Sequence, residues 1–344
     1  MSFRGQDAIH SIRFNQEGGC FSVATQCGFK VYNADPFLLI EHRNLLSGAA
    51  FPPCTACEML YRTSVLALIC NDAAKGMDGS KVIIWDDLRR RVLTSLPFNE
   101  PVRAVRVRTD RLAVVLSRKT LVYSLSDFKL LDHKATAANE EGLVALSAGG
   151  RCVLALPGVN LGTVNVETYP PGTESSQSGC THFLEAHAAS IQSLALSEDG
   201  SLVASASAKG TLIRVFDTQT GAQLHSLRRG SKEAKIGSMA FSPDHNFLAV
   251  TSSRKTIHIF SLMQGGREGD GPRGSAFDSI LSDTAVVKID MKLSKGYDKV
   301  VRFGVVPNTL IVLAYIPGQA GFKYHAYSFN AETGAVIIRD KQDA

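Results

Sequence analysis

The 344-residue sequence lacks the segments that place a chain in or across a membrane. It has no run of 18 apolar residues that could cross a bilayer as a helix. Its first residues carry no apolar signal core, and its last four, Lys-Gln-Asp-Ala, form no prenylation box. The 7 cysteines are odd in number and scattered, which favours reduced thiols over a disulfide framework. We therefore expect a cytoplasmic protein whose folded surface makes any membrane contact.

Signatures of catalysis and of metal binding are also missing. The sequence has no Gly-x-Ser-x-Gly elbow and no His-Glu-x-x-His pair. The glycine-rich stretch 269–274 lacks the strand, helix and Lys-Ser/Thr of a phosphate loop. Cys54 and Cys57 form one CxxC pair, but no second pair or histidine pair follows at zinc-finger spacing. We predict no enzyme, no metal site and no cofactor.

Charge is modest. The net charge is +5, with 20% charged and 44% hydrophobic residues, which is typical of a soluble globular protein. This excess of positive charge favours acidic partners but falls short of the dense basic stripe of a nucleic-acid binder. An anionic membrane surface or a phosphorylated ligand fits better, and we expect a monomer in solution.

What the sequence does contain is a weak internal repeat. Each unit has a strand, a polar turn, a second apolar strand, a glycine-containing turn and a third strand that ends in an aromatic residue. The clearest unit runs from Ile191 to Leu227 and has an Asp-Gly turn between alternating apolar runs, which is a strong hairpin signal. Seven such units average about 49 residues, close to a propeller blade with its loops.

The repeat predicts an all-β fold, a seven-bladed β-propeller of the WD40-like type that forms a single domain over residues 1–344. Stretches with helical periodicity are scarce. In a propeller both faces of each blade pack on neighbouring blades, which explains strands that are apolar on both sides. A longer loop is expected from Asp72 to Ser80 in the second unit.

The stretch Leu227-Arg-Arg-Gly230 stands out within this pattern. Successive side chains of a strand point to opposite faces, so Arg228 and Arg229 should enter the grooves on the two sides of one blade. Arginine suits phosphate and carboxylate oxygens, so both grooves are candidate anion sites. The alternative is that Arg228, Arg229 and also Arg214 pair with acidic side chains such as Asp217 or Asp244.

The flanking strands carry polar groups at regular spacing. Ser205 and Ser207 share one strand face, and Thr256 and His258 share a face with Phe260. Arg214 lies between Leu212 and Phe216 on its own face, which indicates burial. A buried unpaired charge costs several kcal/mol, so this arginine requires an anion.

An insertion at residues 263–283 interrupts the sixth unit between its third and fourth strands. Its first part is rich in glycine and should be flexible. Its second part places Phe277, Ile280 and Leu281 at helical spacing. The insertion is either a loop that folds back onto the propeller or an amphipathic segment that inserts into a membrane.

Leu227-Arg-Arg-Gly230, together with Lys209 to Asp217 and Thr256 to Phe260, resembles the motif region of the PROPPIN family, the autophagy-type propellers that bind phosphoinositides. The usual motif begins with phenylalanine, and Leu227 keeps an apolar residue there. Further matches are Phe14 to Phe21, Val31 to Pro36 and Ile84 to Leu88.

The resemblance implies recognition of phosphatidylinositol 3-phosphate and phosphatidylinositol 3,5-bisphosphate at two rim sites. The first site would use His187, Ser205, Ser207, Gly210, Thr211, Arg214 and Arg228, and the second Arg229, Gly230, Ser252, Thr256 and His258. It also implies membrane insertion of the 263–283 loop and recruitment of an autophagy lipid-transfer or conjugation-machinery protein by the early blades. Asn15 and Glu17 match a partner-binding turn there, although an ordinary hairpin turn explains them equally well.

The protein would then associate peripherally with preautophagosomal, endosomal, vacuolar or lysosomal membranes. His187 and His258 would bind phosphate more strongly when protonated, so affinity should rise as the pH falls from about 7.5 to 6. The rival hypothesis is a WD-repeat scaffold for proteins, whose arginines bind acidic peptides without dependence on lipid.

Overall fold

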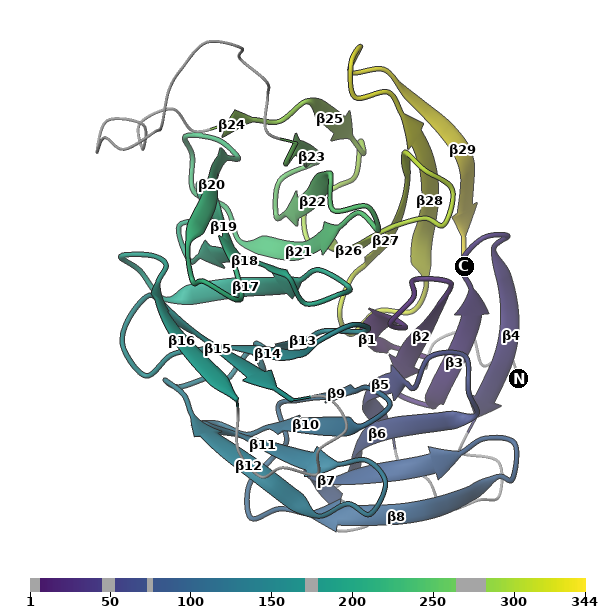
Figure 1. The fold of residues 1–344 in the computed structure, drawn as a ribbon. Coiled ribbons are helices and arrows are strands. Elements are labelled where there is room, and N and C mark those ends of the chain that lie inside the picture. The colour runs from purple at the N-terminus through teal and green to yellow at the C-terminus, as the bar shows by residue number, and fades with distance from the viewer. Residues whose placement is uncertain (1–6, 45–52, 73–76, 171–178, 264–282) are drawn as a thin grey trace.

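The computed structural model describes residues 7–44, 53–72, 77–170, 179–263 and 283–344. Within these ranges every regular element is a strand, and no helix is present that could span a membrane. The strands form seven sheets arranged in a ring (Figure 1). The prediction of a seven-bladed β-propeller is therefore confirmed.

Each blade takes its strands in chain order from the centre of the ring outward. Blade 1 contains β1 (Ile9–Phe14), β2 (Cys20–Thr25), β3 (Gly28–Asn33) and β4 (Leu38–Asn44); blade 2 contains β5 (Cys54–Met59), β6 (Val65–Asp72), β7 (Met77–Asp86) and β8 (Arg91–Pro97); blade 3 contains β9 (Ala104–Val107), β10 (Arg111–Val115), β11 (Lys119–Ser124) and β12 (Leu130–Ala135); blade 4 contains β13 (Ala145–Leu146), β14 (Cys152–Pro157), β15 (Thr163–Tyr169) and β16 (Cys180–Glu185).

The remaining three blades include the insertion. Blade 5 contains β17 (Ile191–Leu196), β18 (Leu202–Ser207), β19 (Leu212–Asp217), β20 (Gln223–Arg228) and β24 (Asp283–Thr284); blade 6 contains β21 (Ile236–Phe241), β22 (Phe247–Ser252), β23 (Thr256–Ser261) and β25 (Val287–Asp290); blade 7 contains β26 (Asp298–Phe303), β27 (Thr309–Tyr315), β28 (Phe322–Phe329) and β29 (Val336–Asp343). The predicted insertion lies between β23 and β25, as expected.

β24 was not expected. This short strand comes directly after the insertion of blade 6, yet it pairs in parallel with the outer strand of blade 5, placing Leu227 opposite Asp283 and Arg228 opposite Thr284. The end of the insertion is therefore hydrogen-bonded beside the arginine pair. Phe277, Ile280 and Leu281 lie outside the described residues.

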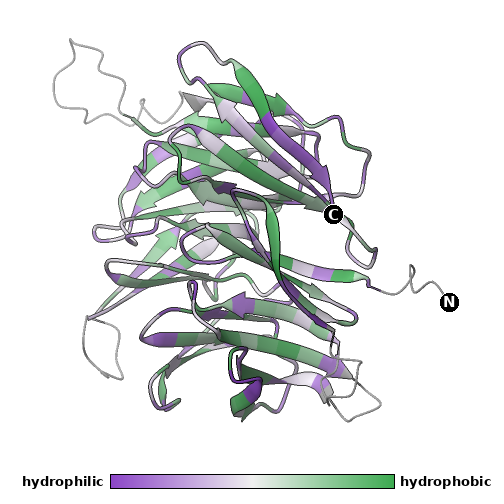
Figure 2. Cartoon of the chain, turned by 90° about the vertical axis from the view of Figure 1, so that its right-hand side faces the viewer, coloured by the Kyte–Doolittle hydropathy of each residue, from purple (hydrophilic) through white to green (hydrophobic). Residues whose placement is uncertain are grey.

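Seven apolar clusters form the core, one between each pair of neighbouring blades. Adjacent residues of an inner strand enter different clusters: in β6, Leu68 packs between blades 1 and 2, and Ala67 packs between blades 2 and 3. Figure 2 shows apolar residues along the strands and hydrophilic residues in many of the turns. This packing explains why the inner strands are apolar on both faces.

Among the strands that the structure describes, none is exchanged where the ring closes between blade 7 and blade 1, because each of these blades uses one continuous stretch of chain. The backbone of Ile9 accepts a hydrogen bond from Gly318 at 2.8 Å and donates one to Gln319 at 2.9 Å. The hydroxyl of Tyr324 donates to the carbonyl of Ala34 at 2.7 Å. One apolar cluster fills the interface.

One predicted loop is partly wrong. The expected loop from Asp72 to Ser80 is shorter, because β6 continues to Asp72 and β7 begins at Met77, and Asn71 and Asp72 pair with Asp78 and Met77. A register shift after Ile69 allows the ladder to continue beyond the blade. The polar composition of this hairpin concealed the strand pairing from the sequence.

Candidate anion-binding sites on the rim

Arg228 ends the strand β20 and Arg229 follows it directly, so the two arginines lie at the outer edge of blade 5. Leu227 is fully buried in the cluster between blades 5 and 6. Arg228 pairs with Leu212, and Ser226 pairs with Arg214, so by alternation Arg228 lies on the face toward blade 4. Arg228 is exposed, whereas Arg229 is 8% exposed. The predicted division of the pair between two grooves agrees with this geometry.

The site between blades 4 and 5 is built around Arg214. Its guanidinium donates to the carbonyl of Ala186, while its Nε is buried and has no hydrogen-bond partner. Ser205 stands opposite Arg214 in the β18–β19 ladder, and its hydroxyl is 3.1 Å from Nε2 of His187. Ser207 shares the face of Ser205. We name this group of residues the blade 4–5 site.

The site between blades 5 and 6 is built around Arg229. Its Nε donates to the carbonyl of Gly210 at 2.6 Å, and its terminal nitrogen donates to the carbonyl of Lys232. Its backbone N–H donates to the carbonyl of Thr211 at 2.9 Å. These contacts fix the guanidinium against the turn that joins β18 to β19. We name this region the blade 5–6 site.

β22 and β23 supply the other wall of the blade 5–6 site. Phe260 is buried in the cluster between blades 5 and 6, so Thr256 and His258, four and two residues earlier on the same strand face, also point toward blade 5. The Nδ1 atom of His258 is buried and has no hydrogen-bond partner. Ser252 is buried at the end of β22. Among the described residues, each rim site thus contains one buried polar atom without a hydrogen-bond partner, and leaving such an atom unpaired is costly.

Positive charge in the two sites is not neutralised by acidic side chains. Within the described ranges, Arg214 and Arg229 bond to backbone carbonyls and form no salt bridge. Burial lowers the pKa of Arg229, and the nearby Arg254 lowers it further. The alternative in which these two arginines pair with Asp217 or Asp244 is wrong, because both carboxylates instead accept hydrogen bonds within their own turns.

The two histidines are uncharged at neutral pH in the ligand-free protein. Burial and then Arg214 lower the pKa of His187 to about 4. Burial, Arg229 and Lys288 lower the pKa of His258 to about 4. The expected protonation of both histidines between pH 7.5 and 6 therefore does not occur in the free protein, because each imidazole faces a cation in a desolvated groove.

Acidification should destabilise the protein through these histidines. Their folded pKa values lie below the unfolded value of about 6.5, so the unfolded chain binds more protons between about pH 6.5 and pH 4. The stability is present above pH 6.5 and is lost as the pH falls, by roughly 2 kcal/mol for each histidine. Melting temperatures of the wild type and of His187→Gln/His258→Asn from pH 7.5 to 4.5 test this. The variant should show a flatter curve, and parallel curves would contradict the assignment.

The structure distributes the other predicted residues differently from the sequence-based sites. Gly210 and Thr211 contact Arg229 through their carbonyls, so they support the blade 5–6 site rather than the blade 4–5 site. Two cations that the sequence analysis missed, Arg254 and Lys288, act electrostatically on that site. The basic turn Arg254-Lys255 before Thr256 was the available signal for the first of them.

Asn15 and Glu17 lie in the β1–β2 turn of blade 1. Asn15 is 2% exposed, its Oδ1 accepts from the N–H of Cys20 at 3.1 Å, and its Nδ2 donates to the carbonyl of Tyr61 at 3.2 Å. Its side chain therefore stabilises the turn and is closed to a partner. The partner-binding hypothesis depends on the exposed Glu17.

Metal chemistry gains no support from the part of the chain that the structure describes. No group of three or more histidine, cysteine, aspartate or glutamate residues could hold a metal ion there. Cys54 and Cys57 are both buried, and burial raises the pKa of the Cys57 thiol.

Comparison with known proteins shows that the sequence matches a protein family. The family model described as PROPPIN matches residues 8–277. SVP1-like protein 2 of Pichia angusta is 34% identical over 259 residues, covering 75% of this chain and 71% of that protein. Autophagy-related protein 18 of Komagataella pastoris is 31% identical over 290 residues, covering 75% of this chain and 52% of that protein. The alignments thus span about half to seven tenths of these relatives.

Solved structures show the same fold. Hsv2 of Kluyveromyces lactis with its complete loop 6CD superposes with a TM-score of 0.80 at 22% identity, covering 98% of this chain and 99% of that chain. KlAtg21 in complex with the coiled coil of AgAtg16 gives a TM-score of 0.77 at 25% identity, covering 97% of this chain and 99% of that chain.

Proposed function

This chain belongs to the PROPPIN family, and on that premise we propose that it is a peripheral membrane protein that binds 3-phosphorylated phosphoinositides. The ligands are phosphatidylinositol 3-phosphate and phosphatidylinositol 3,5-bisphosphate, bound at the blade 4–5 and blade 5–6 sites. The observation that carries this proposal is the pair of buried atoms without partners, Arg214 Nε and His258 Nδ1, one in each site.

A phosphate group supplies what both sites lack. Its oxygens accept hydrogen bonds, and its negative charge offsets the desolvation of Arg229 and the repulsion between Arg229 and Arg254. An inositol ring adds hydroxyl groups that bond to Ser205, Ser207 or Thr256. The neutral histidines then act as hydrogen-bond donors or acceptors to the headgroup.

Two adjacent sites bind a membrane more strongly than either site alone. After the first headgroup binds, the second encounter becomes intramolecular, and avidity of this kind multiplies affinity by about 10² to 10⁴. The insertion at residues 263–283 adds a third contact in this proposal. The pairing of β24 with β20 holds the C-terminal end of the insertion beside Arg228. This end of the insertion therefore lies on the rim that carries both sites.

Recruitment of an autophagy protein is the second half of the proposal. Autophagy-related names among the relatives and a related propeller bound to a coiled coil support it. In this chain a groove of about 290 Å³ between blades 1 and 2, lined by Ile40, Met59 and Arg62 among others, offers a surface on the early blades. The protein would act at preautophagosomal, endosomal, vacuolar or lysosomal membranes.

Flotation with liposomes tests the lipid half directly. Liposomes with phosphatidylinositol 3-phosphate should carry the wild-type protein upward, whereas liposomes with unphosphorylated phosphatidylinositol should not. Increasing salt should weaken binding only in part, because the buried charges are screened less than surface charges. A folded protein that ignores both lipids would favour the scaffold hypothesis, in which acidic peptides occupy the arginines.

A further inference from the structure

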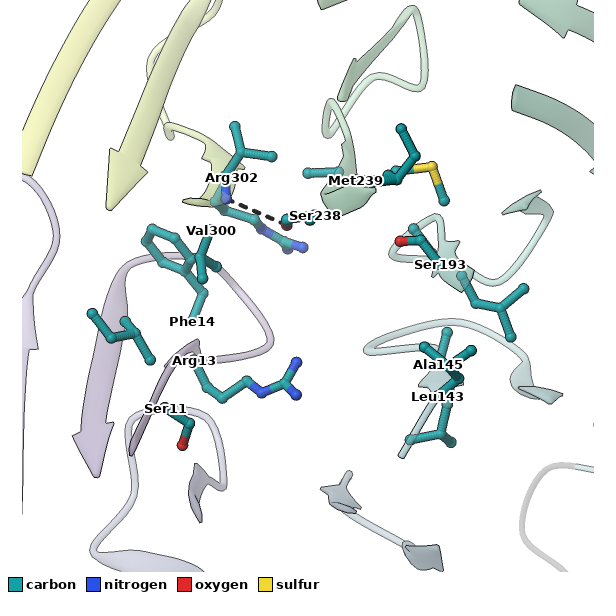
Figure 3. Close-up of a pocket in the computed structure, with 18 of the residues that line it drawn as sticks. Ser11, Arg13, Phe14, Leu143, Ala145, Ser193, Ser238, Met239, Val300 and Arg302 are labelled. Atoms are coloured by element: carbon teal, nitrogen blue, oxygen red, sulfur yellow. Dashed lines mark hydrogen bonds between the residues drawn. The ribbon is translucent and has the colours of Figure 1, made fainter. Parts of the chain in front are cut away.

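A cavity of about 550 Å³ occupies the centre of the ring. Residues from the innermost strands of all seven blades line it (Figure 3). Of the rim-site residues, Ser252 at the end of β22 also lines this cavity, whereas Arg214, Arg229 and His258 do not. Its volume is within the range of small-molecule sites, about 300–1,000 Å³.

One residue from each blade forms a ring of equivalent positions around this cavity, which we call the central tier. In every blade, the residue directly after the innermost strand donates its backbone N–H to a carbonyl at the start of the second strand. The tier residue lies two positions before this donor. The seven tier residues, all of which line the cavity, are Arg13, Glu58, Arg106, Ala145, Ala195, Ala240 and Arg302.

Charge is unevenly distributed in the central tier. Blades 7, 1, 2 and 3 contribute three arginines and one glutamate, and blades 4, 5 and 6 contribute three alanines. Three positive charges minus one negative charge leave the tier with a net charge of +2, and the other charged lining residues, Lys235 and Lys299 against Glu141, Glu198 and Asp298, bring the whole lining to +1. Figure 3 shows Arg13 and Arg302 extending from neighbouring blades into the central space, with Ala145 across from them. The small alanines leave room opposite the guanidinium groups.

The arginines are only partly satisfied by the protein. Arg106 lies 3.5 Å from the carboxylate of Glu58 and donates to the carbonyl of Val105. Arg302 donates to the carbonyl of Gln16 at 2.7 Å. The guanidinium of Arg13 is exposed in the cavity and donates no hydrogen bond to any described residue. Burial, and then the positive charge of Arg13, lowers the pKa of Arg106 to about 10.

We propose that the central tier binds a compact, soluble, phosphate-class anion with at least two negative charges, of which pyrophosphate is the simplest probe. Arginine forks match phosphate oxygens in a bidentate manner. A doubly charged anion would neutralise the net charge of the tier. Arg13 and Arg302 would bind it from adjacent blades, and Arg106 would add charge from across Glu58. The seven inner strands surround the cavity, which favours a soluble anion over a lipid headgroup.

Calorimetric titration of the wild-type chain with pyrophosphate, at constant ionic strength, tests the proposal. Arg13→Gln should weaken binding about tenfold or more, because one charge-assisted contact is lost. Glu58→Gln should strengthen binding, because it removes the opposing charge. The exposed Arg118 of blade 3 provides a matched control, and Arg118→Gln should leave the affinity unchanged.

Two further measurements distinguish binding in this cavity from binding at the rim sites. Arg228→Thr/Arg229→Thr should retain pyrophosphate binding, which would be lost if the anion occupied a rim site. Sulfate should bind more weakly than pyrophosphate at equal ionic strength. No heat of binding in the wild type, or equal affinity in Arg13→Gln and Arg118→Gln, would overturn the proposal. Because the guanidinium of Arg13 bonds to no acceptor among the described residues, its replacement should leave the melting temperature near that of the wild type, which checks folding.

Discussion

Liposomes containing phosphatidylinositol 3-phosphate are expected to float the wild-type chain and to leave Arg228→Thr/Arg229→Thr at the bottom of the gradient. Arg228 belongs to the blade 4–5 face and Arg229 to the blade 5–6 site, so the double change removes a cation from each. A hydrogen bond to a charged group contributes about 1.5–3 kcal/mol. Loss at both sites also removes the avidity between them, so binding should fall to the level of unphosphorylated liposomes.

Single variants and a stability measurement make this result specific. Arg228→Thr changes an exposed side chain and should reduce flotation while the melting temperature stays constant. Arg229→Thr removes hydrogen bonds to Gly210 and Lys232 but relieves repulsion by Arg254, so the variant should still fold. Full flotation of a folded double variant would exclude the two-site proposal.

Gly210→Ala is expected to have the next largest effect, on both stability and lipid binding. Gly210 has φ +57°, and a Cβ atom there would lie 1.9 Å from the carbonyl oxygen of Ala234. Backbone atoms cannot relieve such a contact without moving the turn. The carbonyl of Gly210 holds the Nε of Arg229 at 2.6 Å, so displacement of this turn misplaces the guanidinium. We expect a loss of about 2 kcal/mol or more in unfolding free energy and weaker flotation.

Gly230→Ala is the matched control. Gly230 belongs to the same motif, but a Cβ atom there would meet nothing within 4 Å, and its φ is not in the left-handed region. The same chemical change should therefore alter the unfolding free energy by less than about 0.5 kcal/mol. Chemical denaturation of both variants provides the comparison. Equal losses of unfolding free energy in the two variants would contradict the steric conflict between a Cβ atom at Gly210 and Ala234.

The sequence contained enough information for the blades but not for all of their strands. Inner strands such as β6 and β22 are apolar on both faces, because they lie between two apolar clusters, and they gave the repeat. Outer strands such as β4 and β8 mix apolar and polar residues that are largely exposed, so they have no buried face that would give a regular alternation. The cross-blade pairing of β24 involves two residues and leaves no periodic signal.

Alternation within a strand predicted which face of a blade each rim residue occupies. It could not predict contacts between residues that are distant in the sequence. Thr256, His258 and Phe260 could be assigned to one face from their spacing alone, and the structure agrees. The role of Gly210 depends on Ala234 and Arg229, which come from a different turn and a different strand. The central tier could not be predicted from the sequence. Its seven equivalent positions hold three different residue types, so they form no recognisable repeat.

The closure between blades 7 and 1 has a mechanical consequence. Because no strand is shared there, the two ends of the ring are held by a side-chain cluster and a few hydrogen bonds, such as those of Ile9 and Tyr324. This joint is therefore the place where a pulling force would first open the ring. The proposed lipid-binding sites lie away from this joint, between blades 4 and 5 and between blades 5 and 6. A pulling force at the joint would have to be transmitted through blades 6 and 7, or through blades 1 to 4, before it reached those sites.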